Sequence, residues 1–151
     1  MWNHKNYRLG FDPWGLGLFL LIMLPSIVWF AFPAPNDILR TESVTPMIDT
    51  IAQVLQIIMA AALCLVVNEA RSRYIRRGYK IGAALCVVLY FAGWTVYYAG
   101  IISPFVVLIL CLIPCTAFLL FALARSNAPA LLAAVGFTIC HLIFATANFV
   151  L

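Results

Sequence analysis

Five apolar stretches, each near the length of a membrane span, dominate this chain and leave only short connections between them. They cover about residues 14–32, 46–67, 81–98, 104–124 and 130–151. A transmembrane helix needs about 20 consecutive apolar residues to cross the hydrocarbon core of a bilayer. In lipid every backbone polar group must be satisfied internally, which favours helices for such stretches. The sequence therefore predicts an all-α, polytopic membrane protein with five transmembrane helices in one compact bundle.

The scarcity of charge supports the same fold class. Only 9% of the residues are charged and 66% are hydrophobic, whereas a soluble domain carries about 25% charged residues. No hydrophilic segment is long enough for a second domain, so we expect residues 1–151 to form a single one. The net charge of +4 does not indicate nucleic-acid binding, because most basic residues lie in short connections. The expected location is the bacterial cytoplasmic membrane, with the lipid bilayer as the main partner.

The distribution of basic residues predicts the orientation. Cytoplasmic segments of membrane proteins carry an excess of Lys and Arg. If the N-terminus is inside, the outer segments hold only Arg40, and the inner segments hold all other basic residues: Lys5, Arg8, Arg71, Arg73, Arg76, Arg77, Lys80 and Arg125. We therefore expect the N-terminus inside, and the C-terminus and the 33–46 loop outside.

Polar and aromatic side chains recur at helical spacing inside three of the spans. Polar groups within a span are costly and usually face the bundle interior or a wet cavity. Positions i, i+4 and i+7 share one helix face. Such stripes are Asp49, Gln53 and Gln56 in the second span and Tyr90, Trp94 and Tyr97 in the third. The fifth span has a sparser version, in which Thr138, His141 and Asn148 share a face with only Ala145 between the last two.

These stripes lie at similar depths. At about 1.5 Å per residue, Gln56, Tyr90 and His141 lie roughly 12–15 Å below the outer helix ends, and Trp29 of the first span lies at a matching level. Aromatic walls with a few polar anchors are typical of a small-molecule site. We predict an outer-half cavity that binds a small, partly hydrophobic ligand, for transport or sensing. Its lining would be Trp29, Asp49, Gln53, Gln56, Tyr90, Trp94, Tyr97, His141 and Asn148, and Asp37 and Arg40 of the 33–46 loop would form a lid.

Other interpretations of the same residues remain open. Trp29, Trp94 and Tyr97 could belong to an interfacial aromatic belt. Gln53 and Gln56 could hydrogen-bond a neighbouring helix. Such contacts would fit an accessory or structural subunit of a membrane complex. Gly82, Ala83 and Ala84 also offer a close-packing surface for a homodimer.

A catalytic role is a weaker alternative. A membrane-embedded enzyme acting on a lipid or isoprenoid would need an acid–base pair, but the depths of Asp49 and His141 differ by roughly two helical turns. No serine elbow or His-Glu-x-x-His motif is present. The five cysteines lie in apolar spans, and the pair Cys111 and Cys115 alone makes a poor metal site. We expect no catalytic residues, no metal and no cofactor.

Several local motifs are similar to those of a known family. They are Thr45-Pro46 before the second span, Ile58-Met-Ala-Ala-Ala-Leu63 within it, Gly93-Trp94-Thr-Val-Tyr97-Tyr98-Ala-Gly100 closing the third span, and Ala147-Asn148-Phe149. With its span layout, the chain resembles the tryptophan-rich sensory protein/translocator protein (TspO/MBR) family. Met47 and Val96 stand where that family has proline. The resemblance implies a pocket inside five helices, capped by the loop between the first two, with Trp94 and Asn148 as pocket residues.

Overall fold

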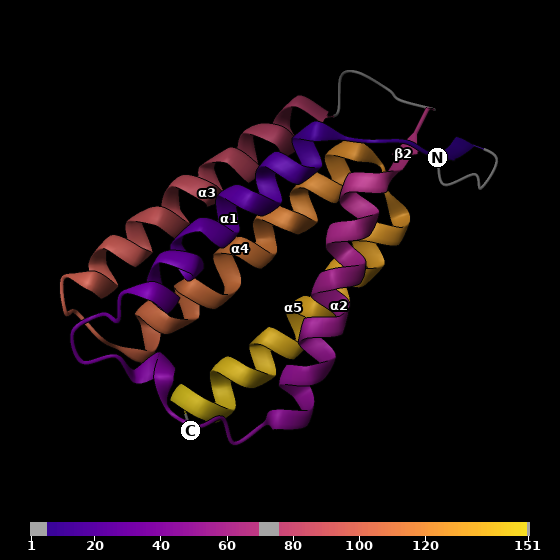
Figure 1. Ribbon diagram of the computed structural model, residues 1–151. Coiled ribbons are helices and arrows are strands. Elements are labelled where there is room, and N and C mark those ends of the chain that lie inside the picture. The colour runs from indigo at the N-terminus through magenta and orange to yellow at the C-terminus, as the bar shows by residue number, and fades with distance from the viewer. Residues whose placement is uncertain (1–5, 70–75, 151) are drawn as a thin grey trace.

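The computed structural model describes residues 6–69 and 76–150, which form five long helices and one very short sheet (Figure 1). The order is β1 (Tyr7–Leu9), α1 (Pro13–Ala31), the 3-10 helix η2 (Ile38–Arg40), α2 (Pro46–Leu65), β2 (Val66–Asn68), α3 (Arg76–Tyr98), α4 (Pro104–Arg125) and α5 (Ala128–Phe149). The α-helices run alternately up and down. We call the end that carries β1, β2 and the α4–α5 turn the strand end. The opposite end, with residues 32–45, is the loop end.

All five α-helices are long and apolar enough to cross a membrane. The chain is therefore a multi-pass integral membrane protein, as the sequence predicted. Helices α1, α4 and α5 lie close to the predicted ranges, but two predicted boundaries are wrong. The second span ends at Leu65 instead of residue 67, and α3 begins at Arg76, inside the connection that was expected to reach Lys80.

The early end of α2 comes from a strand pair that the all-α prediction missed. β1 and β2 pair in antiparallel fashion, with Arg8 opposite Val67. β-branched residues favour an extended backbone when a partner strand is present. The ladder continues beyond the strands through hydrogen bonds from the Gly10 amide to the Leu65 carbonyl (3.0 Å) and from the Asp12 amide to the Cys64 carbonyl (2.7 Å). The N-terminal segment is thus fastened to the end of α2.

Proline and polar caps set the helix starts. Pro13, Pro46 and Pro104 each occupy the first helical position, where a missing N–H costs nothing. Ser103 caps α4 by accepting a hydrogen bond from the Val106 amide (3.2 Å). Thr45 precedes α2 as predicted but makes no side-chain cap bond.

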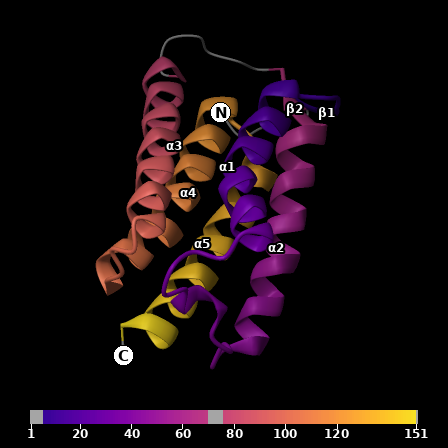
Figure 2. The same cartoon turned by 60° about the vertical axis from the view of Figure 1, so that its left-hand side comes forward.

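Helix α1 packs differently at its two ends. The strongest pairings in the bundle are α3 with α4, α2 with α5, and α4 with α5, and α1 lies between α3 and α2 (Figure 2). At the strand end Gly15 brings the backbones of α1 and α2 together, because a Cβ there would lie 2.3 Å from the Leu63 carbonyl oxygen. Toward the loop end the two helices diverge (Figure 1). The room for a site lies in this half of the bundle.

Buried polar groups close the strand end. Asp12 forms an ion pair with Arg125, and both side chains are largely buried. The Asn127 amide nitrogen donates to the carbonyls of Ala62 (2.8 Å) and Val66 (2.9 Å). These bonds tie the α4–α5 turn to α1 and to the end of α2. The sequence identifies Arg125 only as one of the inner basic residues, and it does not predict this pair.

The small residues considered for a dimer contact pack mainly within the chain. Ala83 is 2% exposed. A Cβ on Gly82 would lie 3.1 Å from Leu120 Cδ1 of α4. Only Ala84 of the three is exposed. This surface therefore serves α3–α4 packing, and a homodimer stays a prediction.

Candidate functional site

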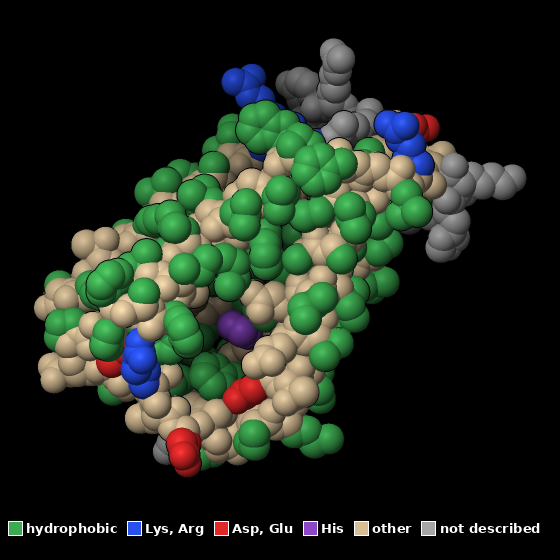
Figure 3. All heavy atoms as spheres, in the orientation of Figure 1, with side chains coloured by type: hydrophobic (Ala, Val, Ile, Leu, Met, Phe, Trp, Pro, Cys, Tyr) green, Lys and Arg blue, Asp and Glu red, His purple; other side chains and the backbone are tan. Residues whose placement is uncertain are grey.

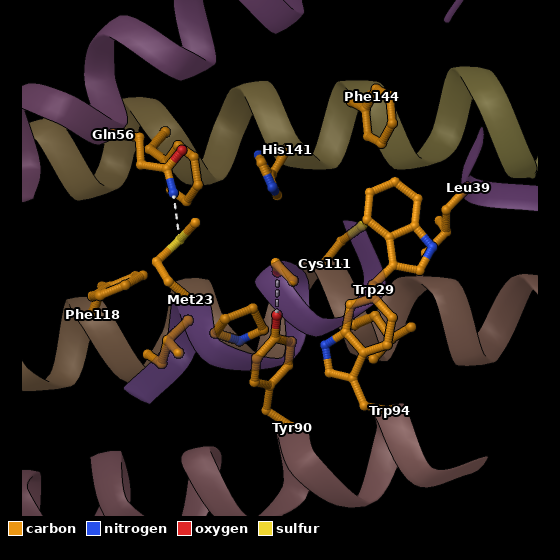
Figure 4. A pocket seen from close by; sticks show the side chains of 15 residues that line it. Met23, Trp29, Leu39, Gln56, Tyr90, Trp94, Cys111, Phe118, His141 and Phe144 are labelled. Atoms are coloured by element: carbon orange, nitrogen blue, oxygen red, sulfur yellow. Dashed lines mark hydrogen bonds between the residues drawn. The ribbon is translucent and has the colours of Figure 1, made fainter. Parts of the chain in front are cut away.

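A cavity of about 210 Å³, which we call the main cavity, lies inside the bundle in the half nearer the loop end (Figure 4). All five α-helices and η2 contribute to it. Its lining consists of Ile22, Met23, Ser26 and Trp29 from α1, Leu39 from η2, Gln56 from α2, Tyr90 and Trp94 from α3, Leu110, Cys111, Pro114 and Phe118 from α4, and Phe137, His141 and Phe144 from α5.

A smaller cavity of about 130 Å³, the side cavity, adjoins the main one. Gln56, Phe137, His141 and Phe144 line both, and Asp49, Ala52 and Gln53 complete the side cavity. On the face between α1 and α2 the molecular surface is hollowed, with a histidine side chain at the base and an acidic side chain nearby (Figure 3). The two cavities therefore meet below an opening on the side of the bundle.

Aromatic rings form one wall of the main cavity. The Trp94 ring is 8% exposed and lies 6.3 Å from Tyr90 and 6.4 Å from Trp29, measured between ring centroids. On the other side Phe137 and His141 are in contact, at 4.2 Å. Aromatic pairs at such separations stabilise one another and keep their rings in place. The cavity is thus bordered by aromatic side chains that pack against one another.

The polar atoms of the main cavity are incompletely paired. Ser26 Oγ and the Tyr90 hydroxyl lie 3.2 Å apart, and the Gln56 amide donates to the Met23 sulfur at 3.2 Å, which is a weak acceptor. Trp94 Nε1 and His141 Nδ1 are buried without a hydrogen-bond partner in the part of the chain that the structure describes. His141 and Trp94 come from opposite sides of the cavity (Figure 4).

Several of the bonds that fasten the loop above the cavity meet at one carboxylate, that of Asp37. Asp37 Oδ2 accepts hydrogen bonds from Trp29 Nε1 (2.7 Å) and Arg40 Nε (3.0 Å), and Oδ1 accepts one from the Tyr97 hydroxyl (2.7 Å). Arg40 Nη2 also donates to the Trp29 carbonyl (2.7 Å), and its guanidinium lies 5.0 Å from the Trp29 ring centroid. Asp37 and Arg40 therefore hold the loop onto α1 and α3, and Leu39 between them reaches the main cavity.

Two of the predicted ligand-binding residues lie in this attachment and line neither cavity. The Tyr97 side chain is fully buried and contacts Asp37. The Asn148 amide accepts a hydrogen bond from the Val44 amide (2.8 Å) and donates to Thr45 Oγ1 (3.1 Å) and to the Phe144 carbonyl (2.9 Å). Because these bonds occupy the Asn148 amide, its role in this structure is to hold the loop.

The other predicted residues come together. Trp29, Gln56, Tyr90, Trp94 and His141 line the main cavity, while Asp49 and Gln53 line the side cavity. The whole α4 wall was missed, and so were the phenylalanines of α5. Apolar residues on a membrane helix look alike in sequence whether they face lipid or a cavity. No periodic signal could have found them.

The geometry gives little support for acid–base catalysis. Asp49 and His141 both line the side cavity, yet no hydrogen bond joins them; Asp49 Oδ1 instead accepts one from Thr45 Oγ1 (3.2 Å). Among the described residues, no three His, Cys, Asp or Glu side chains lie close enough together to hold a metal ion.

The chain matches no protein-family model, and no curated protein or solved structure is significantly similar to it. The similarity to the TspO/MBR family therefore rests on its sequence motifs. Of the two residues carried over from that family, Trp94 lines the main cavity and Asn148 holds the loop. With no similar protein to compare, we infer the function from the two cavities.

Proposed function

We propose that this membrane protein binds a small, largely apolar molecule with hydrogen-bonding groups in the main cavity, as part of transport or sensing. The observation that carries the proposal is the pair of unpartnered nitrogens, Trp94 Nε1 and His141 Nδ1, in an aromatic-walled cavity. A buried polar atom left without a partner costs about 1–3 kcal/mol. A ligand with matching polar groups would remove that cost.

The size of the cavity limits the ligand. An engineered apolar cavity of about 150 Å³ holds benzene, and drug-sized sites run from about 300 Å³ upward. The main cavity, at about 210 Å³, lies between these. It suits one substituted ring or a short branched chain.

The side opening favours a ligand that arrives through the bilayer. The hollow lies between α1 and α2 rather than at the tip of the bundle (Figure 3), and at the loop end the chain is fastened by Asp37 and Asn148. With five membrane-crossing helices, a side opening in this half faces lipid. If the N-terminus is inside, as the basic residues predict, the opening faces the outer leaflet.

The rival proposal of an accessory subunit makes a different demand on the polar stripes. It expects them either to hydrogen-bond neighbouring helices or to face outward, toward another protein. Gln56 and Tyr90 do bond helix α1, through Met23 and Ser26. Gln56, Tyr90 and Trp94 nevertheless line one cavity, and that shared cavity favours ligand binding.

The test is native mass spectrometry of the detergent-purified protein. Trp94→Phe removes the unpartnered N–H and keeps a ring, and Gln56→Leu removes the amide between the two cavities. Trp14→Phe is the matched control, because Trp14 is exposed at the strand end. We expect a bound small molecule in the wild type and in the control, and its loss in both cavity variants. Equal retention in all four proteins would contradict the proposal, and a change in oligomer distribution would favour the accessory subunit.

A further inference from the structure

The side cavity contains a carboxylate without a cationic partner. Asp49 lies half-buried in the first turn of α2, and its one hydrogen bond from another side chain comes from Thr45 Oγ1 (3.2 Å). The three ion pairs formed among the described residues do not include it. Of the described basic residues only Arg40 lies at the loop end, and its guanidinium binds Asp37 and the Trp29 carbonyl. Asp49 therefore has no protein cation to pair with in this part of the chain.

The surroundings of Asp49 are suited to a ligand cation. Gln53 and Gln56 line the same side cavity and supply amide oxygens, and Phe137 and Phe144 supply aromatic rings. A carboxylate attracts a cation more strongly at a partly desolvated site than in water. Aromatic faces within about 6 Å add a favourable cation–π interaction. These groups would stabilise one positive charge.

The main cavity is complementary to the rest of such a ligand. None of its lining residues is an Asp, Glu, Lys or Arg, and its walls are mostly aromatic or aliphatic. Trp94, which is 8% exposed, lines this space, and its Nε1 is buried without a hydrogen-bond partner among the described residues. His141, with its own unpartnered nitrogen, stands where the two cavities join. The joined cavities thus offer an apolar compartment beside an anionic one.

We propose that the ligand class is a lipophilic amine, whose protonated nitrogen pairs with Asp49 while its apolar body fills the main cavity. This inference rests on the function proposed above and adds the chemical class of the ligand. Asp49 in a first helical turn also complements the helix dipole. That role requires only the charge, and it does not account for a cavity lined by aromatic rings and unpartnered nitrogens beside it.

The test compares two probes of the same length, 4-phenylbutylamine and 4-phenylbutan-1-ol, by calorimetric titration of the full-length protein in nanodiscs, with empty nanodiscs subtracted. The wild type should bind the amine about tenfold more tightly than the alcohol, because a partly desolvated ion pair contributes more binding free energy than a typical exposed one. Asp49→Asn should remove this preference, chiefly by weakening binding of the amine. Glu42→Gln is the control: it removes an exposed carboxylate of the loop and should keep the preference.

A second variant keeps the test informative if Asp49→Asn folds poorly. Gln53→Lys places an ammonium four residues after Asp49, in the favourable order for an ion pair on a helix. Gln53→Lys should weaken binding of the amine much more than binding of the alcohol. Equal affinity of the wild type for both probes, or an amine preference that survives both substitutions, would overturn the inference while the proposed function stands. Failure of the wild type to bind either probe would count against both proposals.

Discussion

The hydroxyl of Tyr97 donates a 2.7 Å hydrogen bond to the carboxylate of Asp37. The two residues are far apart in sequence, one on α3 and one in the loop after α1, and their bond fixes the loop above the main cavity. The same carboxylate also holds Trp29 Nε1. The loop and the aromatic wall are therefore connected through one carboxylate, and we expect a change in the loop to alter the cavity.

Tyr97→Phe tests this attachment. The substitution removes the hydrogen bond to Asp37 and leaves the ring in place. We expect the free energy of unfolding to fall by about 1.5–3 kcal/mol, which is typical of a hydrogen bond to a charged group. Amide hydrogen exchange of residues 36–45 should rise. Tyr7→Phe is the matched control, because it removes a tyrosine hydroxyl bond at the strand end, to the Ser126 carbonyl. Unchanged loop exchange in Tyr97→Phe would show that the loop is held by other contacts.

Gly15→Ala tests the close approach of α1 and α2. The added Cβ would lie 2.3 Å from the Leu63 carbonyl oxygen, a backbone atom that cannot rotate away. Forcing the helices apart should cost about 1–3 kcal/mol or more, seen as a lower midpoint in thermal unfolding followed by tryptophan fluorescence. Gly17→Ala, one half-turn on, has no atom within 4 Å of its new Cβ and should be neutral or slightly stabilising. Equal effects would mean that the helices do not touch at Gly15.

Asp12→Asn tests the buried ion pair at the strand end. Asparagine keeps an oxygen to accept the Trp14 amide bond of the helix cap, so the substitution isolates the charge. Leaving Arg125 buried without a counter-ion should destabilise the protein by about 3–5 kcal/mol. The exposed pair of Arg8 and Glu69 provides the comparison: its side chains are 66% and 61% exposed, and Arg8→Gln should cost less than about 1 kcal/mol. A small loss of stability in Asp12→Asn would indicate that water reaches the Arg125 side chain.

The orientation of the bundle can be measured with topology reporters. The basic residues predict that the C-terminus lies outside. Alkaline phosphatase fused after Leu151 should then be active, and a fusion after Glu69, at the opposite end of the bundle, should be inactive. The reverse pattern would place the side opening in the inner leaflet.

Much of the architecture was available from the sequence. Spans of apolar residues have few solutions in a bilayer, so helix number and order could be predicted from the apolar runs alone. The common depth of Gln56, Tyr90 and His141 was also predictable, because the rise of a helix is constant, and all three line the main cavity. The regular repeat of a helix fixes on which face and at what depth each side chain lies. These two properties follow from the local sequence alone.

Tertiary structure decided what each face meets. Tyr97 and Asn148 share faces with cavity residues, yet they bind the loop, because they lie at the loop ends of α3 and α5, where residues 32–45 pass close to them. The α4 wall, the paired strands and the Asp12–Arg125 pair were also beyond sequence reasoning. Each depends on contacts between segments far apart in the chain, and hydrophobicity and spacing describe only the segment in which they occur.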